Sequence, residues 1–298
     1  VLVGLSCRQY AACAEAMPAA FGLSASSVSR RFIRASARHL RTLCERRLDQ
    51  DEFVAVVLDG KTFAQDAMVI ALGVTLQGQK KILGFVQTAT ENEPVCAAFL
   101  RTLVARGLRV EPGLFCVIDG AKGLRTAIQT VFGAQALVQR CQWHKRENVV
   151  RYLPKAQQAA WRRRRQQAYE RPTYAEARAA LGRLRQELRG LNLSAVASLD
   201  EGLEETLTLH GLGLFPMLGV SLKTTNCLES LNAQLGQLTD KVDHWRTSDQ
   251  KQRWVASALS LIEPRLRRIK GYRHLPQLRA ALQAKIGKAE RVEGTRIA

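Results

Sequence analysis

Five short runs of apolar and β-branched residues lie between residues 53 and 140, and they predict strands. Their ranges are 53–58, 68–76, 81–88, 114–118 and 136–139. The segment LQGQK at 76–80 is typical of a hairpin turn between the second and third runs. Helical patterns at 94–108 and 123–133 follow the third and fourth runs. Three successive strands followed by alternating helix and strand predict an α/β fold, with a mixed sheet and helices on its faces.

Helical patterns dominate the first fifty residues, which are also basic. Within residues 6–48, Gly22 would supply a turn and Ser24 would cap the helix that follows. This arrangement is typical of a helix-turn-helix, in which the second helix would present Arg30 and Arg31 to DNA. Any short helical hairpin produces the same pattern, so the sequence leaves a DNA-reading role and a purely structural one open.

The second half of the chain is predicted to be helical as well. Residues 141–222 form basic helical runs that break at Pro172, and the glycine-rich stretch 209–219 is predicted to be a loop. Residues 224–238, TTNCLESLNAQLGQL, carry leucines at three- and four-residue spacing, which predicts a helix packed on the sheet. Beyond residue 240 the chain is basic and predicted to be helical.

The charge of the chain indicates a polyanionic partner. Its 298 residues include 45 Lys and Arg against 26 Asp and Glu, a formal net charge of +19. The basic residues cluster, as in WRRRR at 161–165 and RLRRIKGYR at 265–273. Clustered cations favour double-stranded DNA as the partner over a surface that is basic only for solubility.

Composition also bounds the compartment in which we expect the protein to work. The seven cysteines are odd in number and scattered, which predicts a reducing, cytoplasmic setting without a disulfide framework. No apolar run is long enough for a membrane span, and the first residues lack a signal-peptide pattern. The sequence begins at Val1, which indicates a fragment or an alternative start codon.

Two of the predicted strands end on Asp-Gly, in FVAVVLDG at 53–60 and in FCVIDG at 115–120. A carboxylate at the end of a buried strand is costly unless a positive group meets it. If the first and fourth strands are parallel neighbours, Asp59 and Asp119 converge, and a divalent cation would relieve their repulsion. Oxygen ligands without a histidine cluster favour Mg²⁺ or Mn²⁺ over Zn²⁺. The alternative is that each Asp-Gly is only a turn signal.

A third carboxylate, Glu229, stands near the start of the leucine-rich helix. Asn232 and Gly236 share its face and would leave room for a substrate. The spacing from Asn226 to Glu229 equally fits a capping box, in which the carboxylate would only bind a backbone N–H. The pattern leaves both interpretations open.

Four motifs occur in the order VVLDGKTF, CVIDGAKGLRTAI, QRCQWHKRENV and TTNCLESLNAQL. With them, the chain resembles the Mutator-type transposases of bacterial insertion sequences over roughly residues 50–270. That resemblance implies an RNase H-like core, a mixed five-stranded sheet flanked by helices, with an all-helical insertion. It also implies a DDE triad, which falls on Asp59, Asp119 and Glu229 and would bind two Mg²⁺ (or Mn²⁺) ions. Asp66 is a nearby alternative to Asp59, which we prefer because it ends an apolar strand.

The resemblance divides the chain into four parts. Residues 1–50 would be the DNA-binding segment that resembles a helix-turn-helix, and 51–140 the first part of the catalytic core. Residues 141–222 would be the helical insertion, and 223–298 would hold the closing helix of the core and a basic tail. The N-terminal segment is shorter than is usual in the family, so part of the end-binding region is expected to be missing.

Several basic residues near the motifs are candidates for DNA contacts. Lys122, Arg125, Lys145 and Arg146 would neutralise phosphates beside the triad, and Arg162 and Arg163 lie in the basic run of the insertion. Cys141-x-x-His144 is a family signature but only half a zinc site, so we expect His144 to contact the scissile phosphate or the carboxylates. A packed Cys and His is the alternative. Trp143 and Trp161 could stack on displaced bases, although burial is the default for tryptophan.

The activity that the resemblance implies is DNA transposition. A DDE transposase cleaves at the element's ends, and the freed 3′-hydroxyl then attacks target DNA, with no nucleotide cofactor. Pairing two ends favours a homodimer or higher oligomer on DNA. Two rival functions are an inactive or truncated transposase that only binds DNA, and another RNase H-like nuclease that cuts without joining.

Overall fold

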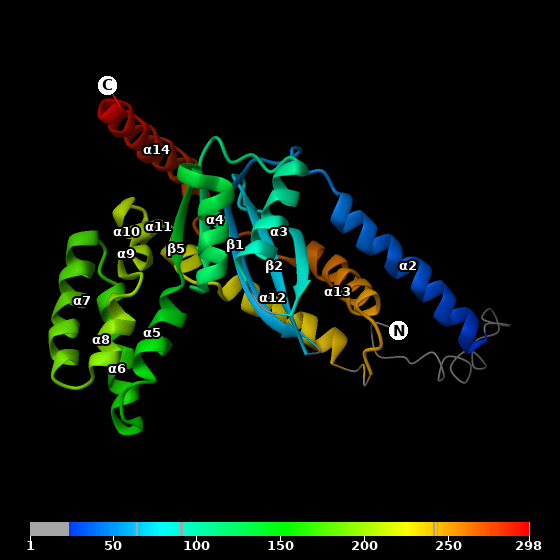
Figure 1. Cartoon of the computed structure of the whole chain (residues 1–298), viewed down its shortest axis with the longest axis horizontal. Coiled ribbons are helices and arrows are strands. Elements are labelled where there is room, and N and C mark those ends of the chain that lie inside the picture. Colours follow the sequence, from blue (N-terminus) through cyan, green and yellow to red (C-terminus); the bar gives the residue numbers. More distant parts are fainter. Residues whose placement is uncertain (1–23, 64, 90–91, 241, 243, 298) are drawn as a thin grey trace.

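The computed structural model describes residues 24–63, 65–89, 92–240, 242 and 244–297 (Figure 1). At its centre is a five-stranded sheet in the order β3-β2-β1-β4-β5. The strands are β1 (Phe53–Phe63), β2 (Asp66–Thr75), β3 (Lys80–Thr88), β4 (Leu114–Ile118) and β5 (Ala136–Arg140). β2 is antiparallel to both of its neighbours, whereas β1, β4 and β5 run parallel to one another. The predicted mixed sheet is therefore confirmed.

The turn between β2 and β3 is the predicted hairpin. Gly78 adopts a φ of 78°, a conformation that favours glycine, and its N–H donates to the carbonyl oxygen of Thr75. A methyl group at Gly78 would clash with the side chain of Tyr272. The hairpin is thus packed against a segment almost two hundred residues further along the chain.

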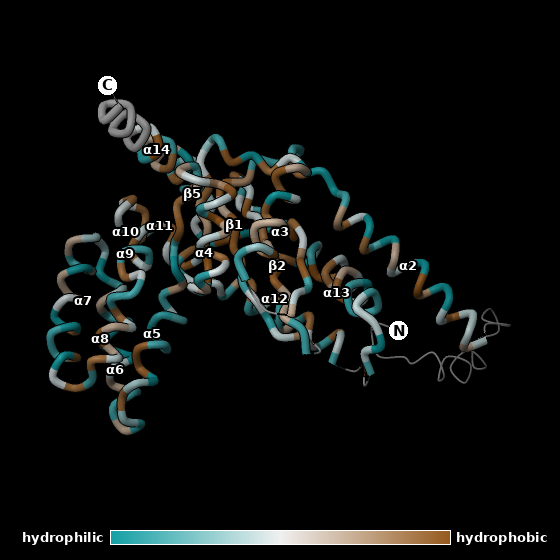
Figure 2. Tube along the Cα trace, viewed as in Figure 1, coloured by the Kyte–Doolittle hydropathy of each residue, from teal (hydrophilic) through white to brown (hydrophobic). Residues whose placement is uncertain are grey.

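The sheet separates two apolar cores. On one face lie α3 (Glu93–Ala105) and α4 (Lys122–Phe132), which pack on Val56 and Leu58 of β1. On the other face lie α12 (Asn226–Thr239), α13 (Ser248–Ile262) and α14 (Leu275–Ile297), which pack on Val57 and Phe63. Figure 2 shows apolar positions gathered along the strands and polar ones along outer helices such as α7 (Tyr174–Arg189).

α2 (Ala25–Glu45) is one continuous helix that leads into the sheet along α13 (Figure 1). Ser24 caps it, because its hydroxyl accepts the N–H of Ser27, as the sequence predicts. Phe32 packs on Trp254 of α13 with 5.0 Å between the ring centroids. The turn at Gly22 and the helix before it lie outside the described residues, so the helix-turn-helix stays a prediction.

Helices fill the chain between β5 and α12, and most of them form a separate lobe (Figure 1). They are α5 (Gln142–Val150), α6 (Lys155–Tyr169), α7, α8 (Leu193–Asp200), α9 (Leu203–Thr206), α10 (Thr208–Gly211) and α11 (Phe215–Leu222). The break at Pro172 is confirmed. The lobe has its own core, from Val149 to Leu207, in which Trp161 and Leu181 are buried.

The glycine-rich stretch 209–219 is a correction. We predicted a loop, but α10 and α11 occupy most of it, and Leu209 and Leu218 are buried in the core. Burial of these apolar side chains against the sheet overrides the low helix propensity of glycine. Among the described residues no helix is both long and apolar enough to cross a membrane.

Candidate active site

Asp59 and Asp119 lie next to each other because their strands are parallel neighbours. Leu58 of β1 pairs with Ile118 of β4, and each aspartate is the next residue along the chain. Side chains alternate between the faces of a strand, so Asp59 and Asp119 share the face that α12 covers. Asp59 is only 6% exposed, and Asp119 is half-buried.

The loop after Asp119 is held in one conformation. The carboxylate accepts the N–H of Ala121 at 2.9 Å, and the carbonyl oxygen of Gly120 accepts a hydrogen bond from Arg140 at 3.0 Å. Gly120 has a φ of 112°, and a methyl group there would clash with the Arg140 guanidinium. Only glycine fits this close approach, which accounts for the second Asp-Gly pair by packing as well as by turn geometry.

Glu229 lies on α12 and does not form the capping box. The N-cap is Thr225 with no side-chain cap, and the N–H of Asn226 donates to Thr224 Oγ1 at 3.4 Å. Glu229 Oε1 is buried and has no hydrogen-bond partner among the described residues. It lies 3.7 Å from His144 Nε2. The helix therefore holds this carboxylate toward His144 rather than toward its own backbone.

His144 of α5 lies beside Glu229 and within the electrostatic reach of Asp59 and Asp119. Its Nδ1 lies 3.4 Å from the hydroxyl of Thr225, and its Nε2 faces Glu229. A hydrogen bond with Cys141, together with the negative charges of Asp59 and Asp119, raises the pKa of His144 to about 9, although burial opposes the shift. The protonated imidazole thus sits within the electrostatic reach of both aspartates and beside Glu229.

The two ends of the insertion meet at this point. The N–H of Gln142, the first residue of α5, donates to the carbonyl oxygen of Lys223 at 3.0 Å. His144 lies just after the start of the insertion, and Glu229 lies just after its end. This closure places the imidazole and the third carboxylate side by side, although they are far apart along the chain.

Two polar residues at the site were not selected from the sequence as binding residues. Lys61 of β1 donates from Nζ to the carbonyl oxygen of Asn232 at 2.8 Å, which ties the strand to α12. Asn232 is 8% exposed, and its side-chain oxygen has no hydrogen-bond partner in the described part of the chain. The strand period could have indicated Lys61, because it stands two residues from Asp59 on the same face.

Asp66 is engaged elsewhere. Its carboxylate pairs with Lys251 of α13 at 2.6 Å and accepts a hydrogen bond from Gln87 at 2.6 Å. The bond to Lys251 lowers the pKa of Asp66. Asp66 therefore belongs to an ion pair with α13. The ground on which we preferred Asp59 is a correction, because β1 does not end there but continues to Phe63; only its pairing with β4 ends at this level.

The candidate DNA-binding residues have different surroundings. Arg30, Arg31, Lys122 and Arg163 are exposed. Arg125 pairs with Glu205, and both Arg146 and Arg162 pair with Glu147 at 2.9 Å.

The two candidate stacking residues differ in exposure. Trp143 is 41% exposed and edge-on to His144, whereas Trp161 is buried. A cavity of about 320 Å³ is lined by Lys122, Arg125, Arg140 and Glu201 among others.

Lys145 is a correction. We predicted a phosphate contact, but the residue is 1% exposed and its ammonium group bonds to the carbonyl oxygen of Glu201. Glu201 Oε2 lies 3.4 Å away. Lys145 falls on the inner face of α5, so its ammonium group is paired with Glu201 inside the protein and does not face DNA.

Comparisons with known proteins agree with the motifs. The profile of the family described as "Transposase, Mutator family" matches residues 2–261. The transposase for insertion sequence element IST2 of Acidithiobacillus ferrooxidans is 29% identical over 175 residues, which cover 58% of this chain and 57% of the relative. The transposase for element IS256 in transposon Tn4001 of Staphylococcus aureus is 32% identical over 172 residues, 56% of this chain and 42% of the relative.

The longest of these alignments is with the transposase for element ISRM5 of Rhizobium meliloti (strain 1021). It is 28% identical over 251 residues, 79% of this chain and 59% of the relative. The chain thus spans about half the length of the curated relatives that it matches. The family profile covers most of the chain, and the chain belongs to the Mutator family of transposases.

Proposed function

We propose that the chain is a DDE transposase that cleaves DNA at insertion-sequence ends and joins the freed 3′-hydroxyl to target DNA. The observation that carries this proposal is the position of one imidazole beside Glu229 and within the electrostatic reach of Asp59 and Asp119. Asp119 follows the end of β4, and Asp59 stands at the same level of β1, where the pairing with β4 ends although β1 continues to Phe63. Glu229 comes from α12, with a buried oxygen that has no hydrogen-bond partner among the described residues.

We further propose that the sheet is an RNase H-like core. Support comes from its strand order, with an antiparallel β2 between β3 and β1 and a parallel β4 and β5 beyond β1. The position of the two aspartates also supports it. Asp119 directly follows the carboxyl end of β4, and Asp59 stands where the parallel pairing of β1 with β4 ends, on the side of the sheet where α/β proteins bind their ligands.

The donor set fits divalent metal ions. No group of three His, Cys, Asp or Glu side chains at metal-ligand spacing occurs within the described residues. However, two adjacent carboxylates and the buried Glu229 Oε1 supply the oxygen ligands that Mg²⁺ and Mn²⁺ prefer. Asp59, Asp119 and Glu229 would hold two ions, which would activate the attacking oxygen and stabilise the leaving oxygen.

The protein's own groups would bind the DNA backbone beside these carboxylates. α4 begins three residues after Asp119 and has no side-chain cap, so its first N–H groups and Lys122 face an incoming phosphate. His144, whose pKa the neighbouring groups raise, lies where it would neutralise a phosphate oxygen or hold Glu229 in place. Arg125, Arg146, Arg162 and Arg163 would extend this basic surface over the insertion, and Arg30 and Arg31 would extend it along α2.

The proposal predicts that Asp119→Asn abolishes strand joining and leaves DNA binding largely intact. The amide keeps the side chain's shape and its hydrogen bond to Ala121 but removes the negative charge. Joining of labelled insertion-sequence ends to plasmid DNA in Mg²⁺ measures the first effect, and fluorescence anisotropy measures the second. Asp66→Asn is the matched control, because that aspartate pairs with Lys251 on another part of the sheet.

Each outcome of this assay decides between functions. Joining that Asp119→Asn removes and Asp66→Asn retains supports a transposase. Cutting without joining indicates a nuclease, and binding without products indicates a regulator that only occupies DNA. Wild-type activity in Asp119→Asn would overturn the catalytic assignment. A homodimer or higher oligomer on paired ends remains part of the proposal, and sizing of the protein–DNA complex would test it.

A further inference from the structure

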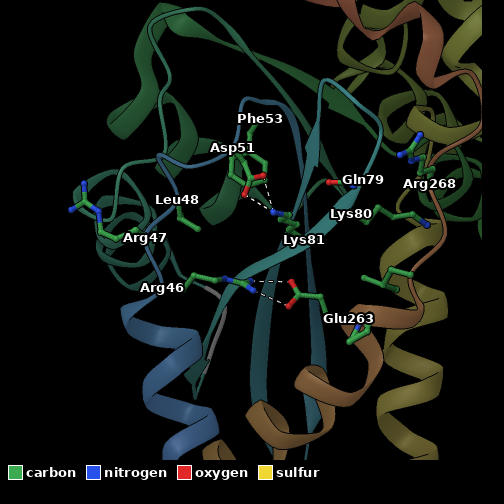
Figure 3. Close-up of a pocket in the computed structure, with 12 residues that line it drawn as sticks. Arg46, Arg47, Leu48, Asp51, Phe53, Gln79, Lys80, Lys81, Glu263 and Arg268 are labelled. Carbon is green, nitrogen blue, oxygen red and sulfur yellow. Dashed lines mark hydrogen bonds and ion pairs between the residues drawn. The ribbon is translucent and has the colours of Figure 1, made fainter.

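A cavity with a basic lining lies at the end of the sheet opposite the carboxylates. It has a volume of about 600 Å³ and is lined by residues around the start of β1, the start of β3 and the segment after α13 (Figure 3). Phe53 lines it, and Asp59 stands six residues further along the same strand. At about 3.3 Å per residue, the cavity is about 20 Å from the candidate active site. No residue of this cavity has a role in the function proposed above.

Some of the charged residues that line the cavity are neutralised within the protein. Arg46 pairs with Glu263 at 2.8 Å, and the same carboxylate accepts the N–H of Ile82 at 2.6 Å. Lys81 pairs with Asp51 at 2.7 Å. These contacts connect the end of α2, the hairpin and the segment after α13, so the wall of the cavity is a built structure and not a loose surface.

Two basic residues of the lining are not neutralised by these ion pairs. Lys80 and Arg268 have no ion-pair partner among the described residues, and Figure 3 shows them on one side of the cavity with no dashed line to either. The Arg268 guanidinium lies over the Tyr272 ring, 5.5 Å from its centroid, which fixes its direction without cancelling its charge. An excess of positive charge therefore faces this cavity.

The segment that carries Arg268 presents further cations outward. Within residues 265–273 the basic side chains are exposed, and the described chain supplies no acidic partner for the four others, Arg265, Arg267, Lys270 and Arg273. The backbone between them is anchored. The N–H of Ile269 donates to the carbonyl oxygen of Gly78 at 3.0 Å, and the carbonyl oxygen of Lys270 accepts the hydroxyl of Ser221 at 3.0 Å. The backbone of the segment is thus held in place, and its basic side chains are exposed on it.

We propose that Lys80 and residues 265–273, together the distal basic surface, bind the phosphate backbone of duplex DNA outside the catalytic centre. Several cations on one anchored segment match a series of phosphates better than they match a single small anion. Contact there would hold the DNA about 20 Å away from the carboxylates, and would carry no base specificity. The proposal rests on the proposed function only in taking DNA as the ligand.

Salt dependence of binding tests the proposal. Each lost phosphate contact lowers the slope of log K against log salt by about 0.9, so Lys80→Ala/Arg268→Ala should lower it by about 1.8. We expect duplex affinity at 0.1 M salt to fall at least tenfold, measured by fluorescence anisotropy with the full chain. Arg101→Ala/Arg109→Ala is the control, because it removes the same charge from exposed positions at α3. Lys80→Gln/Arg268→Gln repeats the test if the alanine variant is unstable.

The outcomes separate this proposal from the proposed function. A wild-type slope in Lys80→Ala/Arg268→Ala, or an equal loss in the control variant, would overturn the distal basic surface. So would loss of inorganic phosphate binding with duplex binding unchanged, because the site would then take a small anion. If the slope falls as expected but the wild type never joins DNA, the surface stands and the transposase mechanism fails.

Discussion

Lys145 lies within one of the sequence motifs, but its side chain is buried in the protein and has a structural role. Its neighbours His144 and Arg146 reach the site and the surface, but the helical period turns Lys145 inward against Glu201. Burial and the nearby Arg140 lower its pKa to about 8, and the carboxylate of Glu201 offsets only part of that effect. With a pKa of about 8, this residue is still mostly protonated at pH 7 and loses its charge at mildly alkaline pH.

This shift predicts how stability depends on pH. The unfolded lysine keeps its proton up to about pH 10.4, whereas the folded one loses it above about pH 8, so the unfolded chain binds more protons in between. Stability should therefore rise with pH in this window. Between pH 7.5 and pH 10, the free energy of unfolding of the wild type should increase, relative to that of Lys145→Met, by up to about 3 kcal/mol. Urea unfolding at both pH values measures the difference, and parallel profiles would contradict it.

At the scale of elements, the positions of the strands are what the sequence predicted best. The apolar runs placed β1 and β4, and Asp59 and Asp119 were expected to be neighbours on the condition that these two strands pair in parallel, which they do. The surroundings of Glu229 could not be predicted, because a capping box and a free carboxylate share one spacing. Only the meeting of α5 with α12 decides between them, and that contact depends on how the insertion closes.

The hairpin turn between β2 and β3 gives a prediction at this scale. Gly78→Ala should lower the free energy of unfolding by about 1–3 kcal/mol, because it places a side chain at a φ of 78° and against Tyr272. Gly182→Ala is the control. That glycine lies within α7 with nothing within 4 Å of an added methyl group, so the change should stabilise by about 0.5–1 kcal/mol. Urea titration measures both, and equal effects would contradict the account.

The whole molecule has apolar clusters that are separate in space. Both faces of the sheet have their own cluster, and the insertion buries Val149 to Leu207 in a third. The helical pattern predicted helices at 141–222, and the family resemblance implied that they form an insertion, but neither predicted α10 and α11 at 209–219. Their glycines indicated a loop, and only the packing of Leu209 and Leu218 against the sheet shows why helices form.

The separate clusters predict local loosening of the structure. Leu181→Ala removes a fully buried side chain from the insertion core at a cost of about 2–5 kcal/mol. Hydrogen exchange should then speed up in α6, α7 and α8, while β1 and β4 keep their protection. Leu231→Ala is the converse variant, because Leu231 of α12 packs on the sheet. A uniform loss of protection in both variants would show that the clusters unfold together.

The hydrogen bond between Gln142 and Lys223 has a consequence for how such proteins diversify. The chain leaves the sheet at Gln142 and returns to it at Lys223, where this hydrogen bond closes the insertion. The length and shape of the insertion are therefore independent of the spacing between the carboxylates. Whole helices of the insertion could be gained, lost or exchanged while this closing contact is kept, much as a domain is inserted into a surface turn. Selection could then change the surface that the insertion offers to DNA without moving the three carboxylates.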